Sequence, residues 1–306
     1  MYYQIKAVYN IISEENLIFD QLPQNSSLIN FSMLRSLEST PLVFRSFSIK
    51  YVLEGCENYT INGHRYEVKS GQFLLANKAN EGLVEIDSNR IVNAICIDVA
   101  PKIIAEAVGS ILRPDTPDAD LNLDRFFTTG EFFESKYDHN STYVGKTLQQ
   151  LGNTLVSTPF ERHEFTQEFY FHLAEQLILD HIPVYKQLQS IGSVKSQTRK
   201  DLLRKLTVAK EYMEHSYGKE LSVETIAREC GLSEYHFFRL FKATFGISPH
   251  QFLIRKRIEN ACKLLQHPGI SIAEIAHQCG FSDIFTFSKS FKKHTGFSPT
   301  HYIHPD

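Results

Sequence analysis

The 306-residue chain lacks any apolar run that approaches the roughly 18 residues of a membrane-spanning helix. Near its start, the Ser-Glu-Glu at residues 13–15 interrupts the sequence before the apolar region of a secretion signal can form. Its five cysteines are odd in number and show no Cys-x-x-Cys spacing, which argues against a disulfide framework and against a zinc module. We therefore expect a cytoplasmic protein without a membrane segment.

Histidine is scarce in the N-terminal part, where residues 1–138 contain only His64. A metal-dependent enzyme of the cupin type needs several imidazoles and a carboxylate around one ion. A lone histidine does not meet this requirement. We therefore expect no metal, no cofactor and no catalytic residue, and a metal-dependent cupin enzyme stays a remote alternative.

Charge is divided unevenly along a chain whose length and hydrophobic content of 42% indicate a soluble protein of two domains. Residues 196–306 contain 16 Lys and Arg against 11 Asp and Glu, whereas the remaining residues contain 16 against 24. A basic C-terminal region beside an acidic N-terminal one indicates that the C-terminal region binds a polyanion such as nucleic acid.

From about residue 17 to residue 100, short β-rich segments alternate with turns. Asn62 and Gly63 lie between two alternating segments, and this pair favours a two-residue type I′ hairpin because both turn residues need a positive φ. Several short antiparallel strands at this spacing predict a barrel or a sandwich.

Helical periodicity follows in residues 101–112, 141–156 and 163–182. The last segment has two adjacent apolar stripes, which leaves two interpretations open. One stripe packs on the barrel and the other on a second subunit, or both are buried within one subunit. Residues 183–198 are polar and contain Pro183 and Gly192, so we expect an interdomain linker there.

The C-terminal region contains nearly the same sequence twice, in residues 226–249 and 275–299. At first the copies align at an offset of 49 residues, and later at 50, so the second copy has one extra residue. The matched pairs are Ile226/Ile275, Ala227/Ala276, Cys230/Cys279, Gly231/Gly280, Phe237/Phe287, Phe241/Phe291, Gly246/Gly296 and Pro249/Pro299.

Each copy predicts two helices joined by a tight turn, in units of residues 222–246 and 271–296. Gly231 and Gly280 suit the left-handed residue of the turn. Four serines are placed as helix N-caps: Ser222, Ser233, Ser271 and Ser282. A helix, a glycine-containing turn and a second helix form the helix-turn-helix unit, whose second helix fits the major groove of DNA.

The outward positions of the two second helices are the predicted DNA contacts. Arg239 suits bidentate contact with a guanine edge, and Lys242 and Lys292 are placed to meet phosphates. The predicted contacts are Tyr235, His236, Phe238, Arg239 and Lys242 in the first helix and Phe285, Thr286, Ser288, Lys289 and Lys292 in the second.

One continuous helix over residues 249–266 is predicted between the copies. About 18 residues give a rod of roughly 27 Å, which sets two recognition helices near one DNA turn apart. Arg255, Lys256 and Arg257 lie on this rod, either as a phosphate clamp or as part of a solvated face.

With these motifs, residues 199–306 resemble the DNA-binding domain of the AraC/XylS family of bacterial transcription regulators, above all in residues 272–302. Residues 51–78 resemble the hairpin of a cupin barrel. The resemblance implies an α+β protein of two domains: an N-terminal cupin-like antiparallel β-barrel with following helices (1–182), and after the linker an all-α domain of two helix-turn-helix units joined by a long helix.

The resemblance also implies a function and partners. The expected function is sequence-specific binding of promoter DNA, with activation through RNA polymerase, as a homodimer formed through helices 141–182. A small-molecule effector such as a sugar is expected in the barrel, at residues that the sequence does not identify. The alternative is a regulator of the same type controlled by a protein partner or by its own abundance.

Overall fold

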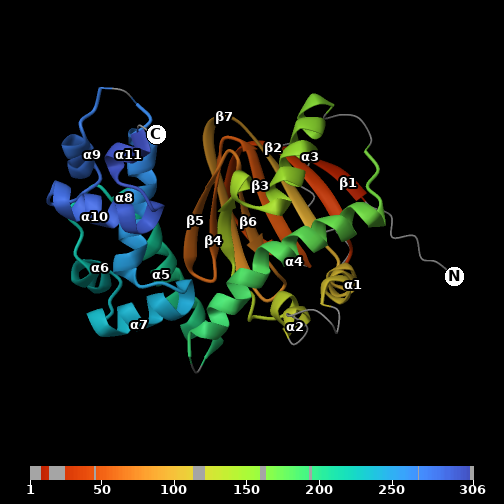
Figure 1. The fold of residues 1–306 in the computed structure, drawn as a ribbon. Coiled ribbons are helices and arrows are strands. Elements are labelled where there is room, and N and C mark those ends of the chain that lie inside the picture. The colour runs from red at the N-terminus through yellow and green to blue at the C-terminus, as the bar shows by residue number, and fades with distance from the viewer. Residues whose placement is uncertain are drawn as a thin grey trace. The chain divides into compact units, whose positions relative to one another are not determined.

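A computed structural model describes residues 8–13, 25–44, 46–112, 121–158, 163–192, 195–267 and 269–303. The chain divides into two compact units, residues 1–185 and 186–306. The first combines a sheet with helices, and the second consists of helices, so the chain has the expected α+β fold (Figure 1).

The N-terminal unit is built on one eight-stranded sheet with the order β1-β2-β7-β3-β6-β8, to which β4 adds through β7, and β5 through β4. The long strand β7 pairs with β2 along one edge, and with β3 and β4 at different ends of its other edge. The strands are β1 Val8–Ser13, β2 Leu28–Val43, β3 Phe47–Glu54, β4 Cys56–Ile61, β5 His64–Lys69, β6 Gln72–Ala76, β7 Glu81–Val99 and β8 Ser135–Asp138.

Two strands lie outside the range in which strands were expected. Strand β1 precedes residue 17, and pairs with β2 in parallel. Strand β8 lies among the expected helices, and pairs with β6 at the sheet edge. Four alternating residues are too few to give a strand signal of their own, and the parallel partner of β1 is set by tertiary structure. The segment 17–24, where the barrel was expected to begin, lies outside the described residues.

The predicted hairpin is confirmed at the turn between β4 and β5. Asn62 and Gly63 have φ angles of 49° and 81°, the left-handed conformation that a type I′ turn requires. Ile61 and His64 pair directly across it. Strand β4 alternates buried and half-buried residues, so that one face points into the core.

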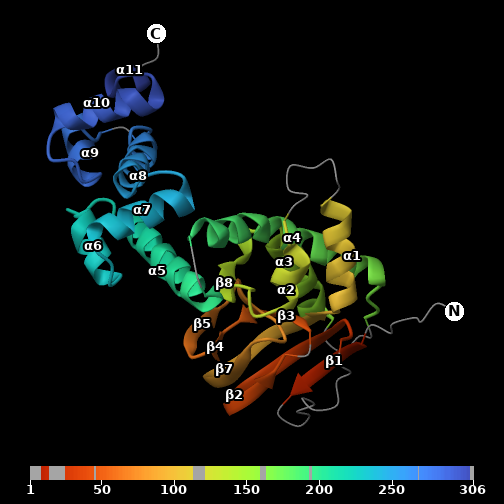
Figure 2. The same cartoon turned by 90° about the horizontal axis from the view of Figure 1, so that it is seen from below.

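Four helices gather on one side of this sheet (Figure 2). They are α1 Pro101–Ile111, α2 Leu123–Thr128, α3 Tyr143–Ser157 and α4 Gln167–Ser190. The short helix α2 was not predicted. Asp180 on α4 accepts hydrogen bonds from the backbone N–H groups of Tyr143 and Val144, at 2.9 and 3.0 Å, and so fixes the start of α3 against α4.

Helix α4 corrects the expected linker, because it continues through Pro183 to Ser190. The proline removes one helical hydrogen bond, but packing just beyond it holds the helix. Tyr185 is buried, and its ring meets that of Phe126 edge to face at a centroid distance of 5.3 Å. The polar composition of the segment reflects an exposed helix face and not an irregular chain.

Helix α4 also bears on the two interpretations of its apolar stripes. One stripe is buried within the single chain at Tyr170, Ala174 and Ile178, and the other is buried at Leu173 and Leu177 but only half-buried at Phe165 and Phe169. Their burial therefore needs no second subunit. Association through residues 141–182 stays a proposal.

The C-terminal unit consists of helices only, apart from their connections. Its helices are α5 Ser196–His215, α6 Val223–Glu229, α7 Glu234–Phe245, α8 Pro249–Leu264, α9 Ile272–Gln278, α10 Ile284–Thr295 and α11 Pro299–Ile303. Among the residues that the structure describes, no helix has the length and apolar character to cross a membrane.

Candidate nucleic-acid interface and barrel pocket

The first helix-turn-helix unit consists of α6 and α7. Ser222 and Ser233 cap the two helices as predicted, and accept hydrogen bonds from the backbone N–H groups of Thr225 and His236. Gly231 has a φ of 66°, the conformation that lets the chain turn between the helices.

The second unit consists of α9 and α10. Helix α9 begins with the predicted capping box, in which Ser271 and Glu274 satisfy each other's backbone N–H groups. The prediction that Ser282 caps the next helix is wrong. Asp283 caps α10 instead and accepts from the N–H of Thr286 at 2.7 Å, while Ser282 donates to Asp283. The extra residue of the second copy lies before this cap, so the position equivalent to Ser233 is 283.

Buried phenylalanines hold the two recognition helices in the same way. Phe237 and Phe241 are fully buried, with ring centroids 5.5 Å apart, and Phe287 and Phe291 repeat this distance and burial. Residues spaced four apart lie on one helix face. The remaining faces of α7 and α10 are therefore left for solvent or a ligand.

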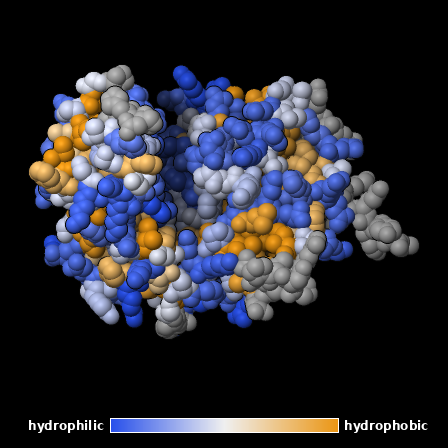
Figure 3. Space-filling view, in the orientation of Figure 1, coloured by the Kyte–Doolittle hydropathy of each residue, from blue (hydrophilic) through white to orange (hydrophobic). Residues whose placement is uncertain are grey.

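Most of the predicted contact residues are exposed. Tyr235 and Phe285, at equivalent positions, are 77% and 82% exposed. In the space-filling view, hydrophobic side chains stand among hydrophilic ones over α9 and α10 (Figure 3). Four cations are exposed, and within the described part of the chain none has an acidic partner or a side-chain hydrogen bond: Arg239, Lys242, Lys289 and Lys292.

Three predicted contact residues are less available. His236 and Ser288 are half-buried. The hydroxyl of Thr286 donates to the Asp283 carboxylate at 2.8 Å and belongs to the helix cap. Exposed Ile284, beside Phe285, was not predicted. The change of offset from 49 to 50 residues between the two copies indicates that the cap is shifted by one residue. This shift could have identified Ile284 as an outward position.

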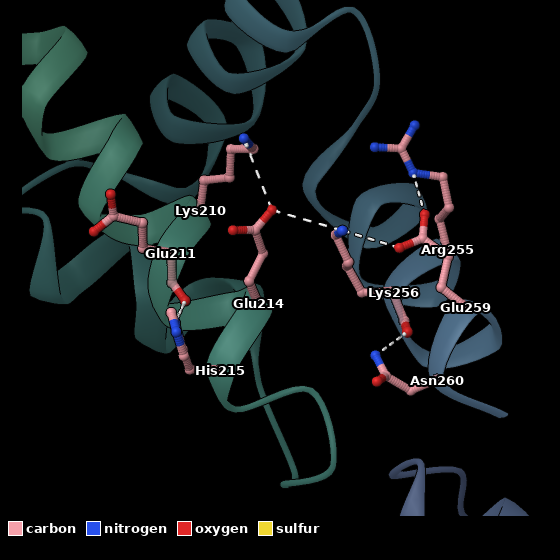
Figure 4. A network of polar contacts seen from close by, with 8 residues as sticks. All are labelled: Lys210, Glu211, Glu214, His215, Arg255, Lys256, Glu259 and Asn260. Atoms are coloured by element: carbon pink, nitrogen blue, oxygen red, sulfur yellow. Dashed lines mark hydrogen bonds and ion pairs between the residues drawn. The ribbon is translucent and has the colours of Figure 1, made fainter. Parts of the chain in front are cut away.

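The cations of the linking helix α8 have partners within the C-terminal unit, but Arg255 is exposed, as the solvated-face interpretation expects, and a phosphate clamp stays a prediction. Lys256 binds Glu259 at 2.9 Å and Glu214 of α5 at 3.8 Å, and Arg255 lies 3.5 Å from Glu259 (Figure 4). Arg257 donates to two backbone carbonyls. Lys256 and Arg257 thus connect α8 to other parts of the C-terminal unit, whereas the partner of Arg255 lies on α8 itself.

The N-terminal sheet lines a partly open pocket of about 100 Å³. A single water molecule needs about 10–15 Å³ on this measure, so the space admits a small organic molecule. Apolar side chains form much of its wall, and polar groups converge at one part of it. These polar groups come from β3, β4 and β7: Lys50, Glu57, Tyr59, Cys96 and Asp98.

These polar groups have hydrogen-bond partners, and the partner of Asp98 is the hydroxyl of Ser48, which donates to it. Lys50 donates to the Cys96 thiol, and Tyr59 donates to Glu57. Burial acts to lower the pKa of Lys50, but Cys96 and Asp98 outweigh it and raise that pKa. Burial also raises the pKa of Glu57 and raises the pKa of Cys96 to about 11. At neutral pH the pocket therefore holds an ammonium and a protonated thiol.

Comparisons with known proteins place the C-terminal unit among regulators. Residues 226–304 match the family described as a helix-turn-helix domain. The Msm operon regulatory protein of Streptococcus mutans is 24% identical over 262 residues, 86% of this chain and 85% of the relative. The lactose operon transcription activator of Staphylococcus xylosus is 34% identical over 96 residues, 31% of this chain and 34% of the relative. The solved structure of ToxT from Vibrio cholerae aligns with 90% of this chain and 97% of its own, at 15% identity and a TM-score of 0.37.

Proposed function

Because the chain is an AraC-type transcription regulator with a helix-turn-helix DNA-binding domain, we propose that both of its recognition helices bind promoter DNA. We further propose that a small molecule in the barrel pocket controls this binding. The observation that carries the DNA proposal is the doubled unit, in which two helices of equal length expose cations at equivalent positions, and these cations have no acidic partner among the described residues. Helix α8, with 16 residues, is about 24 Å long and can set these helices in successive segments of one groove.

The proposed DNA contacts are of two kinds, because some side chains contact base edges and others contact phosphates. Arg239 has the planar fork that matches the two acceptors of guanine. Lys242 and Lys292 lie at equivalent positions near the ends of their helices and act on phosphates. Tyr235 and Phe285 lie in the first turns of their helices, where they meet thymine methyl groups.

We expect Lys292→Ala to weaken binding about equally on cognate and random DNA, and to reduce the slope of log affinity against log salt by about 1. The measurement is a salt titration of binding, with DNA from the chain's own upstream region and a shuffled duplex. Lys78→Ala, which removes an exposed cation from the N-terminal unit, is the matched control and should leave the slope unchanged. A wild-type protein that does not prefer its upstream region to shuffled DNA at moderate salt contradicts the DNA proposal.

We propose activation through RNA polymerase at the promoter, and the similarity to the lactose operon transcription activator of Staphylococcus xylosus supports this direction of control. We also propose a homodimer through α3 and α4. Exposed apolar side chains on these two helices support it: Tyr143, Val156 and Leu179.

The pocket favours a neutral effector with several hydroxyl groups, such as a sugar. Its ammonium accompanies two carboxylates, Glu57 and Asp98, so an anionic ligand would add to negative charge that is already buried. Hydroxyl groups, by contrast, donate to carboxylates and accept from an ammonium. The lactose operon activator matches only about a third of this chain, so the sugar class is argued from the pocket itself.

We expect one neutral sugar or polyol in a broad panel to raise the melting temperature of the full chain in a saturable way. A ligand that binds only the folded state stabilises it by about 2.7 kcal/mol at a concentration 100 times its Kd. Sugar acids of the same size are the control, and should stabilise the chain less. No stabilisation across the panel would favour the alternative, control by a protein partner or by abundance.

A further inference from the structure

In addition to α8, a direct contact joins the segment that leads into the first helix-turn-helix unit to the second unit. The loop 216–219, which precedes α6, lies against the turn between α9 and α10. Arg257 of α8 holds this contact: its Nε donates to the carbonyl of Tyr217 at 2.9 Å, and its terminal nitrogen donates to the carbonyl of Lys219 at 3.0 Å. The guanidinium also lies over the ring of Phe281, 5.6 Å from its centroid. One side chain thus contacts both the loop that leads into the first unit and the turn of the second unit.

Two glycines allow the backbones to approach this closely. A Cβ on Gly280 would lie 2.6 Å from the carbonyl oxygen of Tyr217 and 2.9 Å from Arg257. A Cβ on Gly218 would lie 2.6 Å from the carbonyl oxygen of Gln278. The closest approaches are therefore to main-chain carbonyl oxygens, which no side-chain rotation can move away.

We infer that Arg257 is a positioning residue that fixes the distance and orientation between the two recognition helices. The inference rests on the proposed function, because it concerns how α7 and α10 engage one duplex. Two linked recognition helices raise each other's affinity for DNA only when their spacing and orientation match the two sites that they bind. A rigid connection also removes the entropy cost of ordering the two helices at each binding event. Arg257 supplies that rigidity without contacting DNA.

The experiment uses the full chain and a duplex selected in vitro for binding to it. Two further duplexes have one or the other half of the selected site scrambled. We expect Arg257→Ala to weaken binding to the complete site by roughly 10-fold to 100-fold, and to leave binding to each half site within about twofold. Arg255→Ala is the matched control on the same helix, since its partner Glu259 lies on α8 itself. It should leave the ratio of complete to half-site affinity unchanged.

Arg257→Lys distinguishes positioning from phosphate binding. A lysine keeps the charge but lacks the planar fork that reaches two carbonyls. If Arg257 is a positioning residue, Arg257→Lys should lower the ratio of complete-site to half-site affinity almost as much as Arg257→Ala does. If Arg257 instead contacts a phosphate, Arg257→Lys should keep the ratio of complete-site to half-site affinity. This result would overturn the inference.

The turn glycines provide an independent test. Gly280→Ala and Gly231→Ala introduce the same strain, because both residues have positive φ, at 77° and 66°. Only Gly280→Ala also pushes the units apart, since the atom nearest to a Cβ at Gly231 is the end of the Lys205 side chain at 3.5 Å. We expect Gly280→Ala to lower the ratio of complete to half-site affinity, and Gly231→Ala to keep it.

The outcomes separate this inference from the proposed function. A wild-type chain that selects no preferred duplex contradicts the proposed function. If the wild-type chain selects a duplex but loses nothing when either half is scrambled, or if Arg257→Ala weakens complete and half sites equally, the inference about Arg257 is wrong and DNA binding stands. If Arg257→Ala loses affinity for the complete site but not for either half site, the result supports the inference.

Discussion

Lys50→Met is expected to lower the stability of the N-terminal sheet by about 2–4 kcal/mol at neutral pH, because it leaves buried carboxylates without their cation. Glu57 and Asp98 are almost fully buried, and Lys50 is the ammonium among them. Methionine fills a similar volume, so the loss reports on charge more than on packing. Hydrogen exchange of the full chain measures the effect in β3 and β7, and the exchange of α7 and α10 provides the internal control.

The loss should depend on pH in a definite direction. Burial raises the pKa of Glu57, and Lys50 opposes that rise. Without Lys50 the pKa of Glu57 rises further, and a carboxyl with a raised pKa in the folded state loses stability as pH rises through that pKa. The pKa of Lys50 is itself raised, so its charge is constant below neutral pH. The deficit of Lys50→Met is therefore expected to shrink as pH falls towards 5.

A second substitution isolates the charge. Glu57→Gln combined with Lys50→Met removes an unpaired carboxylate, and should restore part of the lost protection. If the loss of stability in Lys50→Met is the same at all pH values and Glu57→Gln does not reduce it, Lys50 acts through packing. The charge argument for a neutral effector would then be wrong.

The sequence predicted those parts of the fold that depend on neighbouring residues. The Asn62-Gly63 turn and the caps at Ser222, Ser233 and Ser271 lie where expected, because each is formed by residues within a few positions of one another. Asp283 shows the limit of the same reasoning. Asp283 is recognised as the N-cap of α10 only when the two copies are aligned with a shift of one residue. Ser282 is chemically an equally good N-cap, so the residue types alone did not decide between them.

The residues that line the pocket of the N-terminal sheet could not be predicted, because they are distant from one another in the sequence. Lys50 and Cys96 are direct partners in the antiparallel pairing of β3 and β7, and so are Ser48 and Asp98. This register brings the polar groups to one place, and it is set by the burial pattern of whole strands. The partners of Arg257 could not be predicted for the same reason, because they are the carbonyls of a loop about forty residues earlier.

Arg239→Ala is expected to reduce affinity for the cognate site by about 1–3 kcal/mol, or roughly 5-fold to 150-fold, and to relax the preference for one base pair. The side chain is exposed on α7 and has no partner among the described residues. It therefore costs no internal interaction to direct it at a base edge. The measurement compares the wild type and the variant on duplexes in which each base pair of the site is changed in turn.

The second copy provides the matched variant, because Lys289 of α10 occupies the position equivalent to Arg239. Arg239→Lys makes the first helix resemble the second at this point. It keeps the charge and loses the bidentate fork, so we expect the salt slope to stay and the base preference to weaken. Lys289→Ala should lower affinity for all sequences more evenly. If Arg239→Lys keeps the full base preference, Arg239 binds a phosphate, and the two recognition helices share one role instead of dividing readout and anchoring between them.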